Sequence, residues 1–265
     1  MNKEIRLSPS AINTFFRCPR LFYYNYMLKE RGPFNIHLYK GNFVHKALED
    51  LFAISSYPNT KEFVANRMEM WKAPDYLFDT EEEKKFHKLE ATKMIESFVK
   101  RFEEKLDMVM LEGKARDVNH AWNLCKPRLR EHKIYDKENH IVGIIDSIET
   151  NFDEEVYLVD YKTSKLYKNT ISSDYIRQLK LYAYLYRKEF GKLPNYVAVN
   201  YLRYGEVFVV PIDLISETVI DSAVDDINHV RANCVSTEIE DYPACNNDWC
   251  DCNTIKERLE KKSVV

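Results

Sequence analysis

The chain has 265 residues, of which 45% are hydrophobic and 13% aromatic, and its formal net charge is −3. This composition excludes a wholly disordered chain, because one elaborated domain or two small ones can bury a substantial core. The charge does not indicate a polyanion partner, so any nucleic-acid binding must rely on a local basic patch. No apolar run approaches the roughly 20 residues that span a bilayer, and the N-terminus resembles neither a signal nor a transit peptide. We therefore expect a soluble, cytoplasmic protein with no membrane partner.

The first part of the chain, residues 1–110, is predicted to be helical. Ser8 is a suitable N-cap and Pro9 a suitable first helical residue, because the missing N–H of proline costs nothing there. Apolar residues at helical spacing predict a helix over residues 40–54. Acidic residues begin a long amphipathic helix that we expect from about Glu81 to Leu106.

The middle of the chain is rich in β-forming residues. Strands are predicted at residues 118–124, 140–150, 155–163, 195–205 and 206–212. One helix over residues 172–191 interrupts them and ends at Gly191, which readily takes the left-handed cap, and a last helix runs from about Leu214 to Cys234. This order predicts an α/β fold, in which a central mixed sheet is flanked by helices and an N-terminal helical layer. We expect one domain over residues 1–265, made of a helical part (1–110), a sheet core with the active site (111–212), and a closing helix with a cysteine-rich C-terminus (213–265).

An acid and a base end one of these strands. Asp160 and Lys162 follow four mostly apolar residues, and the period-two rule puts their side chains on one face, with Tyr161 on the other. If this strand pairs as a hairpin with the preceding one, Asp146 approaches Asp160. Buried carboxylates are costly alone, so the pair invites a hard cation such as Mg²⁺ or Mn²⁺. A lysine beside it can orient water or stabilise charge on a phosphate oxygen. An isolated D-x-K at a strand end is nevertheless more often a solvated ion pair.

The surrounding motifs favour a metal site over a solvated ion pair. The chain contains, in order, "LSPSAINTFFRCPRLFYY", "GNFVHKALE", "GIID", "DYKT" and a helix with "QLKLY". This series resembles the RecB-like branch of the PD-(D/E)XK nuclease superfamily, which includes nuclease domains of recombination helicase-nucleases and CRISPR-associated adaptation nucleases. The resemblance covers most of the chain and implies a restriction-endonuclease-like core.

The resemblance implies a metal site made by four residues. His45 would bind or position the metal, Asp146 would be the principal carboxylate ligand, and Asp160 would be the second. The backbone carbonyl of Tyr161 would complete the shell. Without the motif around it, a histidine such as His45 is more often a satisfied core or surface side chain.

The same resemblance implies catalytic roles for three further residues. Lys162 would orient the attacking water, and Gln178 and Tyr182, one helical turn apart, would contact DNA phosphate or the lysine. Tyr182 also lies in an aromatic-rich helix, where packing is the plainer interpretation.

Four of the six cysteines match the ligands of a [4Fe–4S] cluster that staples the chain ends in some members of this branch. They are Cys18, Cys245, Cys250 and Cys252. Their number suits such a cluster, but their C-x4-C-x-C spacing departs from the usual C-x-x-C with a later last cysteine. Three interpretations therefore stand, in order: an iron–sulfur cluster, a structural zinc ion, or free thiols. Cys125 and Cys234 are expected to be small core residues.

Two regions are candidates for DNA contact. In the N-terminal part, basic residues alternate with aromatic residues that would either stack on bases or pack the helical layer. The basic residues are Arg17, Arg20, Lys29, Arg31 and Lys40, and the aromatic residues are Phe22, Tyr23, Tyr24 and Tyr26. Lys165 and Lys168 flank the active-site strand and are better placed for phosphate contacts.

We therefore predict a metal-dependent deoxyribonuclease, an exonuclease on DNA ends or single strands. The alternative is a non-catalytic DNA-binding or scaffold subunit of a recombination, repair or CRISPR adaptation complex, and the fold is compatible with each of these pathways, including a virus-encoded one. The chain contains no G-x-x-x-x-G-K-[ST] motif. If unwinding is needed, a helicase or a recombination or adaptation protein must supply it.

Overall fold

The computed structural model describes residues 5–164, 170–212 and 216–263. Its N-terminal helices are α1 (Pro9–Arg17), α2 (Pro19–Phe22), the π-helical turn η1 (Tyr23–Met27), α3 (Ile36–Ala53), α4 (Thr60–Glu69), α5 (Glu81–Leu111) and α6 (Val118–Cys125). The strands are β1 (Leu129–Asp136), β2 (Ile141–Thr150), β3 (Val156–Lys162), β4 (Tyr196–Tyr201) and β5 (Glu206–Pro211). Helix α7 (Ser173–Phe190) lies between β3 and β4, and α8 (Ser216–Asn233) and α9 (Asp251–Ser263) follow β5. The predicted mixed α/β architecture is confirmed.

The five strands form one sheet in the order β1-β2-β3-β4-β5. All neighbours are antiparallel except β3 and β4, which are parallel and joined through α7, as a parallel pair requires a crossover connection. The register pairs Ser147 with Val159, and its continuation puts Asp146 opposite Asp160. The expected hairpin therefore brings the two carboxylates to one place.

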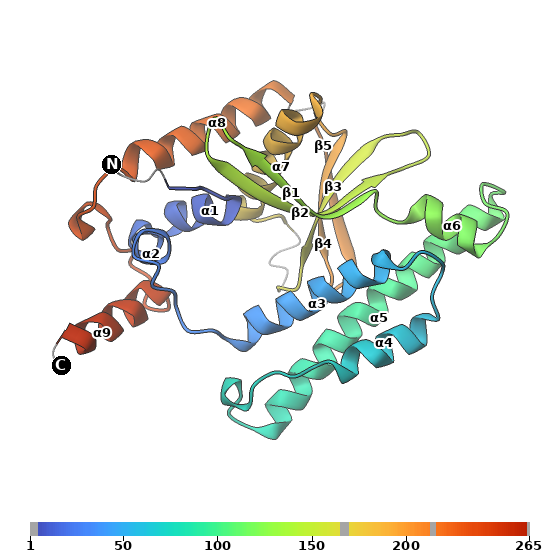
Figure 1. The fold of residues 1–265 in the computed structure, drawn as a ribbon, viewed down its shortest axis with the longest axis horizontal. Helices are drawn as coiled ribbons and strands as arrows, with labels where there is room; N and C mark the ends of the chain where they lie inside the picture. The colour runs from blue at the N-terminus through green and yellow to red at the C-terminus, as the bar shows by residue number, and fades with distance from the viewer. Residues whose placement is uncertain (1–4, 165–169, 213–215, 264–265) are drawn as a thin grey trace.

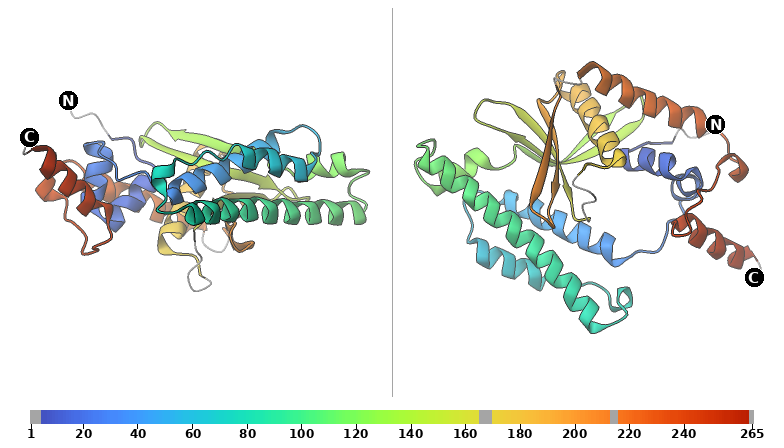
Figure 2. Two further views of the ribbon diagram at one scale, coloured as in Figure 1. Left: turned by 90° about the horizontal axis from the view of Figure 1, so that it is seen from below. Right: turned by 180° about the vertical axis from the view of Figure 1, so that it is seen from behind.

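Helices cover both faces of the sheet. Helices α1, α7 and α8 lie on one side and α3, α4 and α5 on the other (Figures 1 and 2). Adjacent residues of β3 alternate between the two cores: Leu158 packs in the first, and Val159 and Tyr161 pack in the second. The strand end that carries Asp160 and Lys162 thus lies where the two layers meet.

Local sequence explains the helix ends. Ser8 accepts a hydrogen bond from the N–H of Ala11 at the start of α1, with Pro9 as the first helical residue. Gly191 ends α7 with φ of 74°, the left-handed conformation that glycine adopts without a steric penalty. Both expectations are confirmed.

In the β-rich region one prediction was wrong and one strand was missed. Residues 118–124 form helix α6 instead of a strand, because Asp117 caps the helix through the N–H of His120, and Ala121, Trp122 and Cys125 pack at helical spacing. Cys125 therefore ends a helix. Strand β1 was not predicted, because its sequence LREHKIYD is charged and only its C-terminal part alternates in burial.

The long helix also extends further than expected, to Leu111. Lys165 and Lys168 lie outside the described residues. Among the helices that the structure describes, none is both long and apolar enough to cross a membrane.

Candidate active site

The end of β3 carries an ion pair that is nearly closed to water. The Nζ atom of Lys162 lies 2.7 Å from Oδ2 of Asp160, and the Asp160 side chain is only 4% exposed. Tyr161 points to the opposite face, where its ring lies 5.5 Å from that of Phe98. The predicted alternation of these three side chains is confirmed.

Helix α7 adds an amide that bridges the pair. Lys162 donates to Oε1 of Gln178 over 2.9 Å, and Nε2 of Gln178 donates to Oδ1 of Asp160 over 3.0 Å. The same Nε2 atom lies 2.8 Å from the hydroxyl of Tyr182, one turn along the helix. Gln178 is therefore held by three polar partners, and its amide orientation follows from them. The structure brings all four predicted residues into one network.

Strand β2 and helix α3 supply the second half of the site. Oδ2 of Asp146 accepts the backbone N–H of Tyr161 over 2.7 Å, which ties this carboxylate to the end of β3. Its other oxygen, Oδ1, lies 3.5 Å from Nδ1 of His45 on α3. His45 and Asp146 thus meet as predicted, although they are far apart in the chain.

Glu131 is a site residue that sequence reasoning missed. His45, Glu131 and Asp146 each place one ligand atom within 4.8 Å of the others. The neighbouring pairs of β1 and β2 put Glu131 directly across from Asp146. Its φ of 43° is unusual for a residue other than glycine, and such backbone strain concentrates at functional sites. An acid opposite Asp146 could have been found only if β1 had been predicted.

Asp160 is not part of that three-residue group. It couples to the group electrostatically: the pKa of Asp160 is raised to about 6, because burial and the charge of Asp146 outweigh the attraction of Lys162. Lys162 has a raised pKa, since burial alone would lower it but Asp160 favours its charge more strongly. The pKa of His45 is raised to about 10, because hydrogen bonds to Asp146 and Glu131 overcome the opposing effect of burial.

The donor atoms fit a hard divalent cation. Carboxylate oxygens suit Mg²⁺ and Mn²⁺, and Glu131 and Asp146 supply them beside the imidazole of His45. Oδ2 of Asp160 is buried, and the ammonium of Lys162 lies 2.7 Å from it.

The four predicted cysteines also converge. The Sγ atoms of Cys18, Cys245, Cys250 and Cys252 all lie within 4.8 Å of one another. Cys18 separates α1 from α2 and accepts the N–H of Leu21 over 3.3 Å. Cys125 and Cys234 are outside this group, and Cys125 is buried in the second core.

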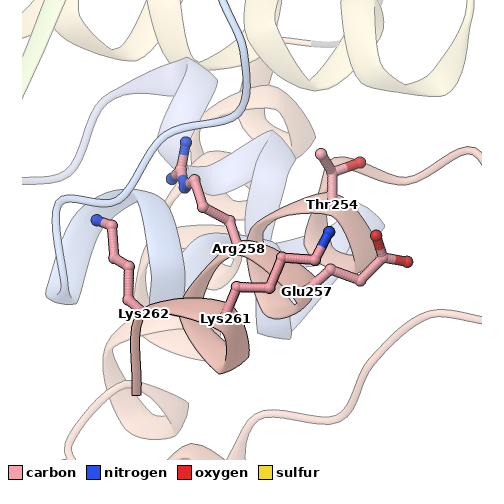
Figure 3. Close-up of a pocket in the computed structure, with 5 residues that line it drawn as sticks. All are labelled: Thr254, Glu257, Arg258, Lys261 and Lys262. Atoms are coloured by element: carbon pink, nitrogen blue, oxygen red, sulfur yellow. The ribbon is translucent and has the colours of Figure 1, made fainter. Parts of the chain in front are cut away.

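Three of the N-terminal aromatic residues pack inside the protein. Phe22, Tyr23 and Tyr24 are buried in the first core, which favours packing over base stacking for these rings. A cavity of about 470 Å³ lies between α1 and the start of α7 and borders the site through Gln178. Another of about 680 Å³ lies along α9 and contains none of the site carboxylates, being lined by Thr254, Glu257, Arg258, Lys261 and Lys262 (Figure 3).

The chain is similar to known proteins in solved structures and in one family model. Two solved structures are similar to the chain at 14% sequence identity. One is a proposed exonuclease from Eubacterium rectale, with a TM-score of 0.48, and the match covers 95% of this chain and 87% of that one. The other is SSO0001, with a TM-score of 0.27 and coverage of 72% and 86%. No curated protein sequence matches the chain. A family model described as the PD-(D/E)XK nuclease superfamily matches residues 6–255, and the chain therefore belongs to this superfamily of nucleases.

Proposed function

We propose that the protein is a metal-dependent deoxyribonuclease that removes nucleotides from DNA ends or single strands. The proposal rests on one observation: two clusters of polar and charged side chains lie next to each other in a member of a nuclease superfamily. One cluster is Asp160, Lys162 and Gln178, and the other is His45, Glu131 and Asp146. The N–H of Tyr161 joins them through Asp146.

The carboxylates of Asp146, Asp160 and Glu131, with His45, would hold Mg²⁺ or Mn²⁺, and the carbonyl of Tyr161 is a further candidate ligand. When bound, the cation would supply Lewis acidity and a lowered pKa for water. The imidazole of His45 is protonated at neutral pH in the metal-free protein, given its raised pKa. It would have to release this proton before it could act as a ligand.

Lys162 would orient the attacking water or stabilise the charge that develops on a phosphate oxygen. Gln178 holds the ammonium from one side and Asp160 holds it from the other. This two-sided contact fixes the direction of a long, flexible side chain, and such preorganisation is what electrostatic catalysis requires. Tyr182 would support Gln178 and so act as a positioning residue.

The competing function is a DNA-binding subunit without catalysis. A buried acid with a raised pKa destabilises the metal-free fold at neutral pH, and a protein that does not need the metal gains nothing from it. This cost favours the nuclease.

The test is digestion of end-labelled single- and double-stranded DNA with Mg²⁺, with Mn²⁺ and with a chelator. Lys162→Ala should lower cleavage by at least ~10²-fold and leave metal binding largely intact, because lysine is not a ligand. Lys188→Ala, which removes an ion pair with Glu138 away from the site, is the matched control. If wild type and Lys162→Ala bound DNA equally and both were inert, the scaffold function would replace the nuclease.

We also propose that residues 1–265 act as one nuclease domain, inside the cell, where DNA is available. Because the chain has no phosphate-binding loop of the G-x-x-x-x-G-K-[ST] type, a separate helicase or a recombination or adaptation protein would unwind duplex substrates.

A further inference from the structure

The four-cysteine group joins the two ends of the fold. Cys18 lies at the junction of α1 and α2, Cys245 and Cys250 precede α9, and Cys252 lies in its first turn. The side-chain Nε of Arg20 donates to the carbonyl of Tyr242 over 2.6 Å, and its backbone N–H donates to Pro243. Helices α2 and α9 consequently lie side by side (Figures 1 and 2).

The spacing of the sulfur atoms distinguishes between the two metal centres that four thiolates can hold. Around a single tetrahedral zinc ion, each Zn–S distance is ~2.3 Å, so the thiolates lie ~3.8 Å from one another. In a [4Fe–4S] cluster each thiolate binds a different iron. The separation of two thiolates then increases by the whole distance between their two iron atoms.

The observed sulfur atoms are too close together for the cluster. No two of them are more than 4.8 Å apart, so no separation exceeds the single-ion value by more than ~1 Å. The cluster would need this increase to equal the distance between two iron atoms, and two iron atoms bridged by sulfide cannot lie only ~1 Å apart. The sulfur positions in this fold therefore match one ion and do not match a four-iron cluster.

The sequence spacing agrees with this geometry. The C-x4-C-x-C arrangement of Cys245, Cys250 and Cys252 departs from the C-x-x-C arrangement of the iron–sulfur relatives. Cys250 and Cys252 are separated by one residue and contribute to the same compact group. The N–H of Leu21 points at the sulfur of Cys18 over 3.3 Å, which stabilises a thiolate ligand.

We infer that Cys18, Cys245, Cys250 and Cys252 form a structural site for one zinc ion, in place of the iron–sulfur cluster that the family resemblance implies. Zinc is preferred over a single ferrous ion, because the same thiolate site binds zinc more tightly. With all four positions taken by protein sulfur, the ion has no open position for a substrate and acts by holding α2 against the C-terminal segment.

The test is a metal count on the whole chain, produced with both iron and zinc supplied and purified without oxygen. We expect about one zinc ion per chain, no acid-labile sulfide and none of the visible absorption of iron–sulfur proteins. X-ray absorption at the zinc edge should show four sulfur neighbours at ~2.3 Å and no nearby metal. Four iron atoms with sulfide, a single iron atom, or no metal in this protein would each overturn the inference.

Two matched serine variants locate the ion. Cys250→Ser should lose most of the zinc and lower the thermal midpoint, whereas Cys234→Ser, which is outside the group, should keep both at the wild-type value. Asp146→Asn should also retain the zinc, which separates this site from the carboxylates. Zinc that remained in Cys250→Ser but left Asp146→Asn would contradict the assignment. If Cys250→Ser does not fold, the wild-type metal count and X-ray absorption still decide.

Discussion

Asp160 is an acid in a position that disfavours its charge. Its pKa is raised to about 6 by burial and by Asp146, although Lys162 acts in the opposite direction. A folded-state pKa above the unfolded value of ~3.9 means that this group's contribution to stability is fully present below about pH 4. The contribution is lost as pH rises through about 6, so the metal-free fold is less stable at pH 7.

Asp160→Asn should therefore stabilise the metal-free protein at pH 7 by roughly 1–3 kcal/mol while abolishing cleavage. Urea denaturation of both proteins without metal measures this gain in stability, and at pH 4 the difference should shrink. A variant no more stable than wild type at pH 7 would show that Asp160 is not destabilising.

A second prediction at the scale of single residues concerns the role of Glu131 in binding the cation. Glu131→Gln removes one charge from the group with His45 and Asp146 and should raise the Mg²⁺ concentration needed for cleavage by about 10–100-fold. Titration of cleavage with Mg²⁺ measures this shift. The control is Glu189→Gln. Glu189 lies on α7, and its Oε1 atom is 2.7 Å from Nε2 of His132, which lies on β1 next to Glu131. Equal Mg²⁺ requirements in the two variants would remove Glu131 from the metal site.

At the scale of elements, α7 must lie close to β2 to bring Gln178 to the site. Gly143 makes this approach possible, because a Cβ atom there would lie 2.5 Å from Cδ1 of Leu185. The contact is with a well-packed core residue that is fully buried. The glycine is therefore needed for helix–sheet packing.

Gly143→Ala should lower the free energy of unfolding by about 1–3 kcal/mol and reduce cleavage, because the side chain of Leu185 or helix α7 has to shift. Ile144→Ala, at the adjacent and 46% exposed position, should change stability by no more than about 0.5 kcal/mol. Denaturant unfolding and cleavage rates are measured together. Full activity in Gly143→Ala would mean that the packing of α7 on β2 does not position Gln178.

At the scale of the whole molecule, the site joins two helical layers through five elements, α3, β1, β2, β3 and α7. A cation bound to them stabilises only the folded state, by ~2.7 kcal/mol when its concentration is 100 times the dissociation constant. Protons compete for His45 and Asp160, whose pKa values are raised to about 10 and about 6. Mg²⁺ should therefore bind more tightly as pH rises.

The increase in thermal midpoint caused by a fixed Mg²⁺ concentration should consequently be larger at pH 8 than at pH 5. Differential scanning calorimetry with and without Mg²⁺ measures it, and Asp146→Asn should remove the increase at both pH values. The same increase at both pH values in wild type would mean that the cation does not displace these protons.

Local patterns were sufficient for part of this protein. Period-two alternation put Asp160 and Lys162 on one face, and helical spacing put Gln178 one turn from Tyr182, and both are seen. Each depends only on residues close in sequence, so the sequence by itself determined them. The α/β order and the four cysteines that meet were also predicted from the sequence, the cysteines through the family resemblance.

Tertiary structure decided the rest. Residues 118–124 form helix α6 because the ring of Trp122 is buried in the helical layer. Strand β1 forms because it pairs with β2, although its charged sequence does not predict a strand. That pairing alone brings Glu131 to Asp146. The separation of the four sulfur atoms likewise depends on how α2 meets α9, across more than 200 residues of chain. Contacts between distant segments are set by packing of the whole core, and no short window of sequence contains them.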